Sequence, residues 1–399
     1  MKRLWYDLKL AKRFWKENIM IYLDNSATTK PYREVLESFN KVSTEYFGNP
    51  SSLHGLGGDS DKLLSQAREQ IAKLLKVQAN EIFFTSGGTE SNNIAIKGTA
   101  LMYRGRGRHI ITTEIEHPSV KESMEQLKDL GFRITYIPVD GNGVVNVSEI
   151  KKAISEETIL VSVMHVNNEI GSIQPINEIG QLIKQYSKIL FHVDYVQGIG
   201  KVPLHFHDCQ IDLCTISAHK FHGLKGTGAL FIRQGVRISP LFSGGGQEWQ
   251  QRSGTENVAG IVAMAKALRM TLQRQDNSQT EMRKIRDLIR TELEEIAGIK
   301  IHTPVHQCAP HIINFSIHGF KAEVFVHALE EKGIYVSTTS ACSSKTKKAS
   351  STLLAMGIPE EEALSSIRVS LSYENTMEEA TQFIESVNEA VTRLRKVMN

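Results

Sequence analysis

The sequence predicts an α/β protein in which one large, mainly parallel sheet is flanked by helices and followed by a smaller C-terminal α+β part. Over the first two thirds of the chain, short apolar runs alternate with helical stretches, as a parallel sheet with crossover helices requires. A long charged helical pattern then runs from after Gly254 to about Ile296, and the rest mixes strands with amphipathic helices. The length of 399 residues suits two domains of unequal size.

Seven apolar runs are the expected strands of the large sheet. They cover residues 81–85, 109–113, 133–139, 159–165, 189–193, 212–216 and 228–232. Their β-branched and aromatic side chains fit a pleated, buried surface. Four amphipathic stretches are the expected crossover helices, over residues 61–75, 90–102, 119–130 and 176–186. This alternation predicts parallel strands with helices on both faces of the sheet.

A shift in composition near residue 275 is the expected domain boundary. We assign residues 30–275 to a large domain. Residues 20–29 and 276–399 would form a small domain with a mobile loop, at about 337–350, that carries Cys342.

The first 19 residues differ from the rest because they hold six basic and two acidic side chains. They therefore carry a charge of +4 and leave −1 for the remainder of a chain whose net charge is +3. Leu4, Leu8, Ala11 and Trp15 fall at helical spacing, so a membrane-surface helix is one interpretation. We prefer a non-native or upstream extension, because Met20 directly precedes the first strand-like run, as an initiator would.

Composition excludes several classes of protein. The balance of 47 basic and 44 acidic residues gives no electrostatic case for nucleic-acid binding. No apolar run is long enough for a membrane span, and no secretory signal opens the chain, so a cytoplasmic protein is expected. Four irregularly spaced cysteines favour reduced thiols over a disulfide framework.

The first chemical motif, residues 84–90, is a strand end, a glycine turn and a helix start that includes Gly88 and Thr89. Such a turn can present backbone N–H groups to a phosphate, although it is more often only a turn and a cap. A second motif ends an apolar strand with a carboxylate, Asp194, which needs a cationic partner or a structural salt bridge. In a third, Lys220 follows a buried strand among small residues, which suits a lysine that bonds covalently to a carbonyl.

Residues 217–220 and the glycines after them resemble the lysine signature of class V aminotransferases, which are fold-type-I enzymes that use pyridoxal 5′-phosphate (PLP). From Ile21 onward the chain is similar to the cysteine desulfurases of the NifS/IscS type. Ten blocks in family order carry this resemblance: YLDNSATT (22–29), FGNPSSLH (47–54), FTSGGTESNN (84–93), TEIEHPSV (113–120), MHVNNEIG (164–171), HVDYVQ (192–197), GGGQE (244–248), RSGT (252–255), SACSS (340–344) and SSIRVSLS (365–372).

The resemblance implies that Lys220 bonds covalently to PLP and that Asp194 pairs with the pyridine nitrogen. It places Asn168 and Gln197 at the ring hydroxyl and His117 on the ring face, where His117 would also move protons. An isolated histidine after a strand is otherwise more often structural. The phosphate would be held by Gly88, Thr89, Ser217, His219 and, from the partner of a homodimer, Thr255.

Arg368 lies in an apolar run where an unpaired charge would be costly. By the resemblance it binds the substrate α-carboxylate, together with Asn168; a structural ion pair is the alternative. Cys342 lies among small polar residues, as expected of an exposed nucleophile rather than a core or inert surface thiol. Thr339 occupies a position where the family often has glycine.

The implied reaction converts L-cysteine to L-alanine and leaves the sulfur on Cys342 as a persulfide, with Lys220 or His117 as the base. A sulfur-acceptor protein would then receive it, in iron–sulfur cluster assembly, tRNA thiolation or another pathway. The alternatives are a selenocysteine lyase or an aminotransferase, and a sulfur-carrier protein. We expect no metal site, although His302, His306, Cys308 and His311 could be drawn as one and Cys342 could transiently bind an iron–sulfur cluster.

Overall fold

The computed structural model describes residues 20–338 and 349–398. Its large sheet has the strand order β2-β8-β7-β6-β5-β3-β4, and only β8 runs antiparallel to its neighbours. The strands are β2 (Ile82–Thr85), β3 (His109–Thr113), β4 (Arg133–Ile137), β5 (Thr158–Met164), β6 (Leu190–Asp194), β7 (Leu213–Ser217) and β8 (Gly228–Ile232). The predicted seven-stranded, mainly parallel sheet is thus confirmed.

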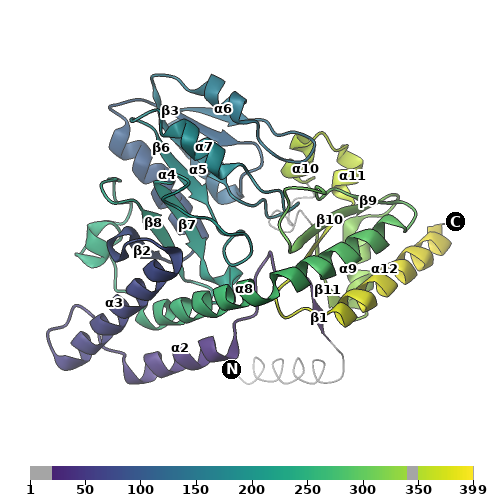
Figure 1. Cartoon of the computed structure of the whole chain (residues 1–399), viewed down its shortest axis with the longest axis horizontal. Helices are drawn as coiled ribbons and strands as arrows, with labels where there is room; N and C mark the ends of the chain where they lie inside the picture. The colour runs from purple at the N-terminus through teal and green to yellow at the C-terminus, as the bar shows by residue number, and fades with distance from the viewer. Residues whose placement is uncertain (1–19, 339–348, 399) are drawn as a thin grey trace.

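Helices cover the faces of this sheet (Figure 1). They are α2 (Arg33–Glu45), α3 (Gly55–Leu75), α4 (Gly88–Tyr103), α5 (Pro118–Asp129), α6 (Val147–Ala153) and α7 (Ile176–Ile183). The stretches named from the sequence did not include α2, α6 or residues 55–60 at the start of α3. That first turn holds three glycines, which favour a loop, but the His54 ring accepts a hydrogen bond from the Gly57 N–H and caps the helix.

A second, antiparallel sheet has the order β12-β13-β10-β9. It comprises β9 (Ile299–Ile301), β10 (Ile312–Ile317), β12 (Ser337–Thr338) and β13 (Ser366–Ser370). The nearby helices are α9 (Ala322–Glu330), α10 (Ser351–Ala355), α11 (Glu360–Leu364) and α12 (Met377–Met398). A short parallel pair, β1 (Ile21–Tyr22) and β11 (Ile334–Tyr335), lies beside this sheet.

The long helix α8 (Val258–Glu294) contributes to two hydrophobic cores. Ile261 and Leu268 pack with the core of the large sheet, whereas Met282 and Ile289 pack with the second sheet. The division expected near residue 275 therefore falls inside a continuous helix (Figure 1).

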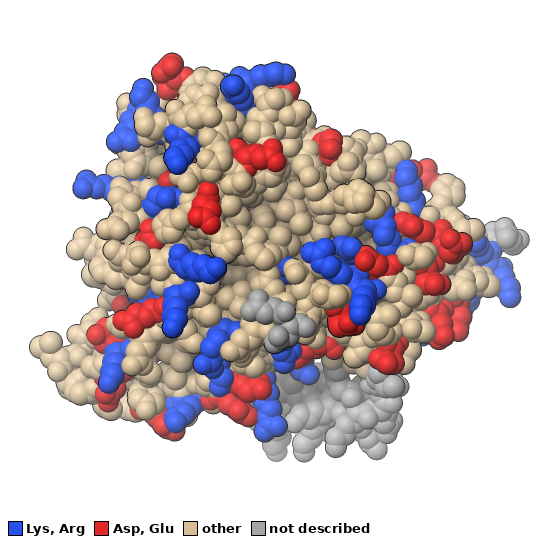
Figure 2. Space-filling view, in the orientation of Figure 1, with Lys and Arg blue, Asp and Glu red and all other residues tan. Residues whose placement is uncertain are grey.

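Charged side chains of both signs are interspersed on the face shown in Figure 2. None of the helices in the described part of the chain is long and apolar enough to cross a membrane. Residues 1–19, including the segment interpreted above as an extension, lie outside the described residues.

Candidate active site

The predicted site residues meet at one edge of the large sheet. Asp194 and Ser217 end the neighbouring parallel strands β6 and β7, and Lys220 ends the short 3-10 helix η2 (Ala218–Lys220) that follows β7. Strand β2 runs in the same direction as β7, because both are antiparallel to β8. The turn after β2 therefore opens at the same edge, where parallel sheets bind ligands.

The turn after β2 contains Gly87, whose φ of 150° and ψ of −174° suit only glycine. Helix α4 begins at Gly88, and its N-terminus has no side-chain cap. Its first N–H groups can therefore bind an anion. Gly87 is close to Ser217, since a Cβ on it would lie 3.6 Å from the Ser217 Oγ. Thr89 is exposed at this terminus.

Lys220 contacts the segment 22–29, which contains β1 residue Tyr22 and the turn after it. Its Nζ donates hydrogen bonds to the carbonyls of Ser26 and Ala27, at 2.9 Å for the latter. The Gln197 Nε2 also donates to the Ser26 carbonyl, at 2.9 Å. Beside Lys220, burial and the lysine charge lower the pKa of His219 to about 4, so this ring is neutral at physiological pH.

Asp194 is a buried carboxylate, 6% exposed, with neutral hydrogen-bond donors. Its Oδ2 accepts from the Asn92 Nδ2 at 2.8 Å, and its Oδ1 accepts from the Val196 N–H at 3.0 Å. Within the described ranges, no lysine or arginine forms an ion pair with it. A buried carboxylate that has hydrogen bonds but no cationic partner is suited to binding a cationic ligand.

His117 is the N-cap residue of α5 and lies close to Asp194 and Lys220. Its Nδ1 accepts a hydrogen bond from the Ser119 N–H at 3.1 Å and lies 2.8 Å from the Ser119 Oγ. Burial lowers the pKa of His117, and the nearby Asp194 carboxylate partly opposes this effect.

Arg368 lies within β13 and is 4% exposed. Its Nη2 pairs with the Asp24 Oδ1 at 2.8 Å, and its Nη1 donates to the Asn168 carbonyl at 3.0 Å. The ion pair considered above as the alternative is therefore present. The Arg368 Nε has no partner among the residues with a described placement, so the guanidinium retains a donor for a further acceptor.

Two predicted residues are not part of this cluster as described. Thr255 is exposed in the loop that precedes α8, and Cys342 lies outside the described residues. Three contacts were missed by sequence reasoning, namely Asp24 on Arg368, Asn92 on Asp194, and Ser119 on His117. Asp24 and Asn92 stand in recognised blocks, but nothing local shows which partners they meet.

These groups can accommodate a phosphorylated pyridine that carries an aldehyde. The uncapped α4 terminus suits the phosphate, and the unpaired carboxylate of Asp194 suits a protonated ring nitrogen. The Lys220 amine suits the aldehyde carbon.

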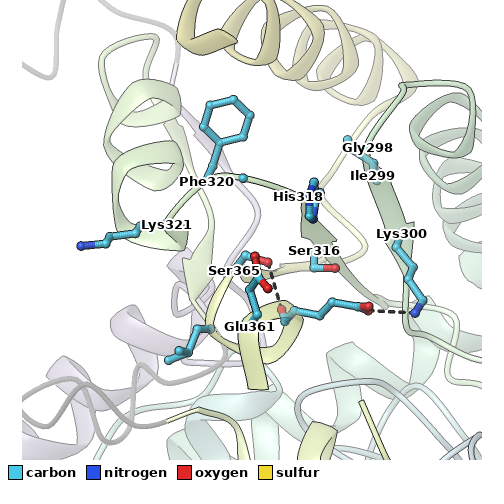
Figure 3. Close-up of a pocket in the computed structure, with 12 residues that line it drawn as sticks. Gly298, Ile299, Lys300, Ser316, His318, Phe320, Lys321, Glu361 and Ser365 are labelled. Carbon is cyan, nitrogen blue, oxygen red and sulfur yellow. Dashed lines mark hydrogen bonds and ion pairs between the residues drawn. The ribbon is translucent and has the colours of Figure 1, made fainter. Parts of the chain in front are cut away.

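Another cavity, of about 460 Å³, lies in the second sheet region between β9, β10 and α11 (Figure 3). The Nζ of Lys300 pairs with the Oε2 of Glu362 at 2.8 Å beside it. No residue predicted to act in the site lines this cavity, so we do not place the chemistry there. The described residues also contain no group of three potential metal ligands, and Cys209, Cys214 and Cys308 are buried free thiols.

Comparison with known proteins identifies the family. The family model for class-V aminotransferases matches residues 21–383. A NifS/IcsS protein homolog of Lactobacillus delbrueckii subsp. bulgaricus is 47% identical over 380 residues, 95% of this chain and 99% of the relative. The cysteine desulfurase IscS of Dictyoglomus turgidum is 43% identical over 378 residues, 94% of this chain and 96% of that protein.

A solved structure of a NifS-like protein has a TM-score of 0.89 at 40% identity and covers 94% of this chain and 100% of its own. The matches therefore extend over both sheets and every described residue of the site. The chain belongs to the class-V aminotransferase family of PLP-dependent enzymes and, within it, to the NifS/IscS-like cysteine desulfurases.

Proposed function

We propose that this protein is a PLP-dependent cysteine desulfurase that converts L-cysteine to L-alanine and transfers the sulfur to Cys342. The observation that carries the proposal is that Lys220 and Asp194, a buried carboxylate with only neutral hydrogen-bond partners, both lie near His117. The relatives named as cysteine desulfurases support the choice of substrate.

When bound, PLP supplies an electron sink that stabilises negative charge at the substrate α-carbon. Lys220 would hold the cofactor covalently, and Asp194 would keep a proton on its ring nitrogen. Gln197 and Asn168 would contact the ring hydroxyl. The phosphate would be bound by the α4 N-terminus and neighbouring side chains, namely Gly88, Thr89, Ser217 and His219.

Arg368 would bind the substrate carboxylate with the donors that Asp24 and Asn168 leave unused. The Lys220 amine would then remove the α-proton and become an ammonium group. The Cys342 thiolate would attack the substrate sulfur, so that an S–S bond forms and the C–S bond breaks. The electron pair of the C–S bond remains with carbon, which takes up protons and leaves as L-alanine.

A homodimer is the proposed assembly. Large apolar side chains are exposed in two segments, namely Phe47, Leu53 and Leu56 in the first and Phe242 and Trp249 in the second. Ser51 of the first segment and Trp249 of the second line one hollow. Contiguous exposed apolar groups commonly mark protein interfaces. Exposed Thr255 follows the second segment, so docking of a second copy could bring Thr255 of the partner subunit to the phosphate.

The persulfide sulfur must leave Cys342 before another turnover. We propose an acceptor protein in iron–sulfur cluster assembly or tRNA thiolation, in a reducing compartment such as the cytoplasm. A transient iron–sulfur cluster at Cys342 belongs to the same proposal. Selenocysteine lyase activity is the second candidate, because Arg368 and Lys220 would bind selenocysteine equally well.

The test uses wild type, Cys342→Ala and a matched control, Cys209→Ala, whose thiol is buried in the large core. Each is incubated with PLP, L-cysteine and a thiol reductant while cofactor absorbance, alanine and sulfide are recorded. We expect equal alanine and sulfide from wild type and Cys209→Ala. The Cys342→Ala protein should change cofactor absorbance but release no sulfide. Equal turnover by all three proteins would show that Cys342 is not the nucleophile.

A further inference from the structure

A continuous polar relay connects Asp194 to His117 through two residues to which nothing above assigns a function. The Nδ2 of Asn92, on α4, donates to the Asp194 Oδ2 at 2.8 Å and to the Ser119 Oγ at 2.9 Å. The Ser119 Oγ lies 2.8 Å from the His117 Nδ1. Asn92 is 1% exposed and Ser119 is 8% exposed, so water does not compete freely with these bonds.

The direction of each hydrogen bond in the relay follows from its chemistry. An ionised Asp194 can only accept, so the amide of Asn92 must turn its NH₂ group toward it. The second N–H of that group then donates to the Ser119 oxygen. The Ser119 hydroxyl accepts this bond with an oxygen lone pair, so its own hydrogen can still be donated to the His117 Nδ1.

A second donor fixes the same ring nitrogen. The backbone N–H of Ser119 points at the His117 Nδ1 at 3.1 Å, as part of the cap of α5. A backbone amide cannot reverse its direction, so Nδ1 must present a lone pair. We propose that Asn92 and Ser119 are positioning residues that hold His117 as the neutral tautomer with its proton on Nε2, and that couple it to Asp194.

This tautomer restricts what His117 can do in the reaction. The Nε2 already carries a proton, so it can donate a hydrogen bond but has no lone pair with which to remove one. Protonation of Nδ1 would turn the Ser119 hydroxyl from a donor into an acceptor and would leave the Ser119 backbone N–H facing another proton. The base that removes the α-proton is therefore Lys220. This last step depends on the proposed function, whereas the tautomer itself does not.

The charged and titratable groups near His117 come from several elements: Asp194 on β6, Lys220 on η2, Lys121 on α5 and His219 on η2. Burial is the main cause of the lowered pKa of His117; Asp194 favours a charged ring, and the two lysines oppose it. A titration of His117 therefore reports the balance of these charges together with the hydrogen bonds at Nδ1.

The direct test is nuclear magnetic resonance of the full-length protein labelled with ¹⁵N-histidine, with and without PLP. The His117 signals are identified by their loss in His117→Gln. We expect a protonated Nε2 and a bare Nδ1 in both forms. A protonated Nδ1 would overturn the proposal, and this wild-type measurement depends on neither a variant nor catalytic activity.

The contribution of the relay is measured by titrating the His117 signals in three variants. Ser119→Ala removes the hydroxyl donor to the neutral ring, so the proton affinity of His117 should rise about fivefold, the worth of one ordinary hydrogen bond. Ser119→Thr keeps a hydroxyl and should restore the wild-type titration. Ser123→Ala is the matched control, because the Ser123 Oγ lies on the same helix and donates to the Ser119 carbonyl at 2.8 Å.

An unchanged titration in Ser119→Ala, or an equal change in Ser123→Ala, would refute the relay. A normal tautomer and titration in a protein without desulfurase activity would refute the proposed function and leave the relay intact. Conversely, full activity with a protonated Nδ1 would remove the relay and leave the proposed function standing.

Discussion

A buried ion pair between Arg68 and Glu248 supports strand β2, which leads into the turn that contains Gly87. Breaking this pair tests how that turn is held in place. The carboxylate of Glu248 accepts from the Arg68 Nη2 at 2.7 Å, from its Nη1 at 2.9 Å and from the Phe84 N–H at 2.9 Å. The guanidinium lies 4.4 Å from the ring centre of Phe84 and 4.6 Å from that of Trp249. This clamp joins α3, β2 and the short 3-10 helix η3 (Gln247–Gln250).

Glu248→Gln keeps the shape of the side chain but removes the carboxylate that forms an ion pair with the buried Arg68 cation. The two side chains are only 10% and 3% exposed, so solvent screens little of the loss. Removing one partner of such a pair costs about 3–5 kcal/mol. With its amide oxygen in the place of Oε2, glutamine can retain two of the three accepted bonds, those from the Arg68 Nη1 and the Phe84 N–H, which places the expected loss near the lower end, about 3 kcal/mol. The loss also releases η3, where Glu248 and Trp249 have φ values of 47° and 51°.

The assay is urea unfolding of the PLP-free protein at fixed concentration. Glu37→Gln is the matched control, because it breaks the Arg33–Glu37 pair, whose side chains are 88% and 58% exposed. That control should lose less than about 0.5 kcal/mol. The double variant Arg68→Met/Glu248→Gln should lose less than the sum of the single variants, because methionine packs between the two rings. Equal losses in Glu248→Gln and Glu37→Gln would contradict this account of the clamp.

Two further predictions concern the site. Arg368→Lys should lower kcat/KM for L-cysteine about 100-fold in steady-state kinetics, because one ammonium group cannot bind Asp24, the Asn168 carbonyl and a substrate carboxylate together. A change of less than about threefold would contradict the role of Arg368 in binding the substrate. Burial raises the pKa of Glu116 to about 8 from an ordinary 4.5. Between pH 4.5 and pH 8, Glu116 therefore stays protonated in the folded protein but is ionised in the unfolded chain. The free energy of unfolding should fall across this pH range, by up to about 5 kcal/mol in total. Glu116→Gln should flatten that decline in unfolding measurements at several pH values, and an unchanged slope would argue against it.

The sequence predicted the parts of the fold that have a local signal. Each strand of the large sheet is an apolar run, and a polar residue at its end, such as Asp194, marks the binding edge without further information. Helix α6 was missed because its seven residues span barely two turns, too few to show a helical period. The start of α3 was missed for a different reason, because its three glycines are typical of a loop.

The contacts that define the site were hidden because they join distant positions. Arg368 and Asp24 are 344 residues apart, and Asp194 and Asn92 are 102 residues apart. A carboxylate or amide in the sequence shows that a partner is needed, but only the fold selects the partner. For the same reason Arg368 could be assigned to the substrate by resemblance, whereas its structural ion pair was an alternative without a named partner until the fold placed Asp24 beside it.

The segment that joins these distant contacts is the short stretch 22–29. Asp24 pairs with Arg368 of the second sheet, whereas the carbonyls of Ser26 and Ala27 hold the Nζ of Lys220 beside the large sheet. Residues 24–27 therefore contact both the lysine of the proposed chemistry and the arginine of the proposed substrate site. Neither contact has a local signal in the sequence, because one short segment meets residues that lie 194 and 344 positions further along the chain.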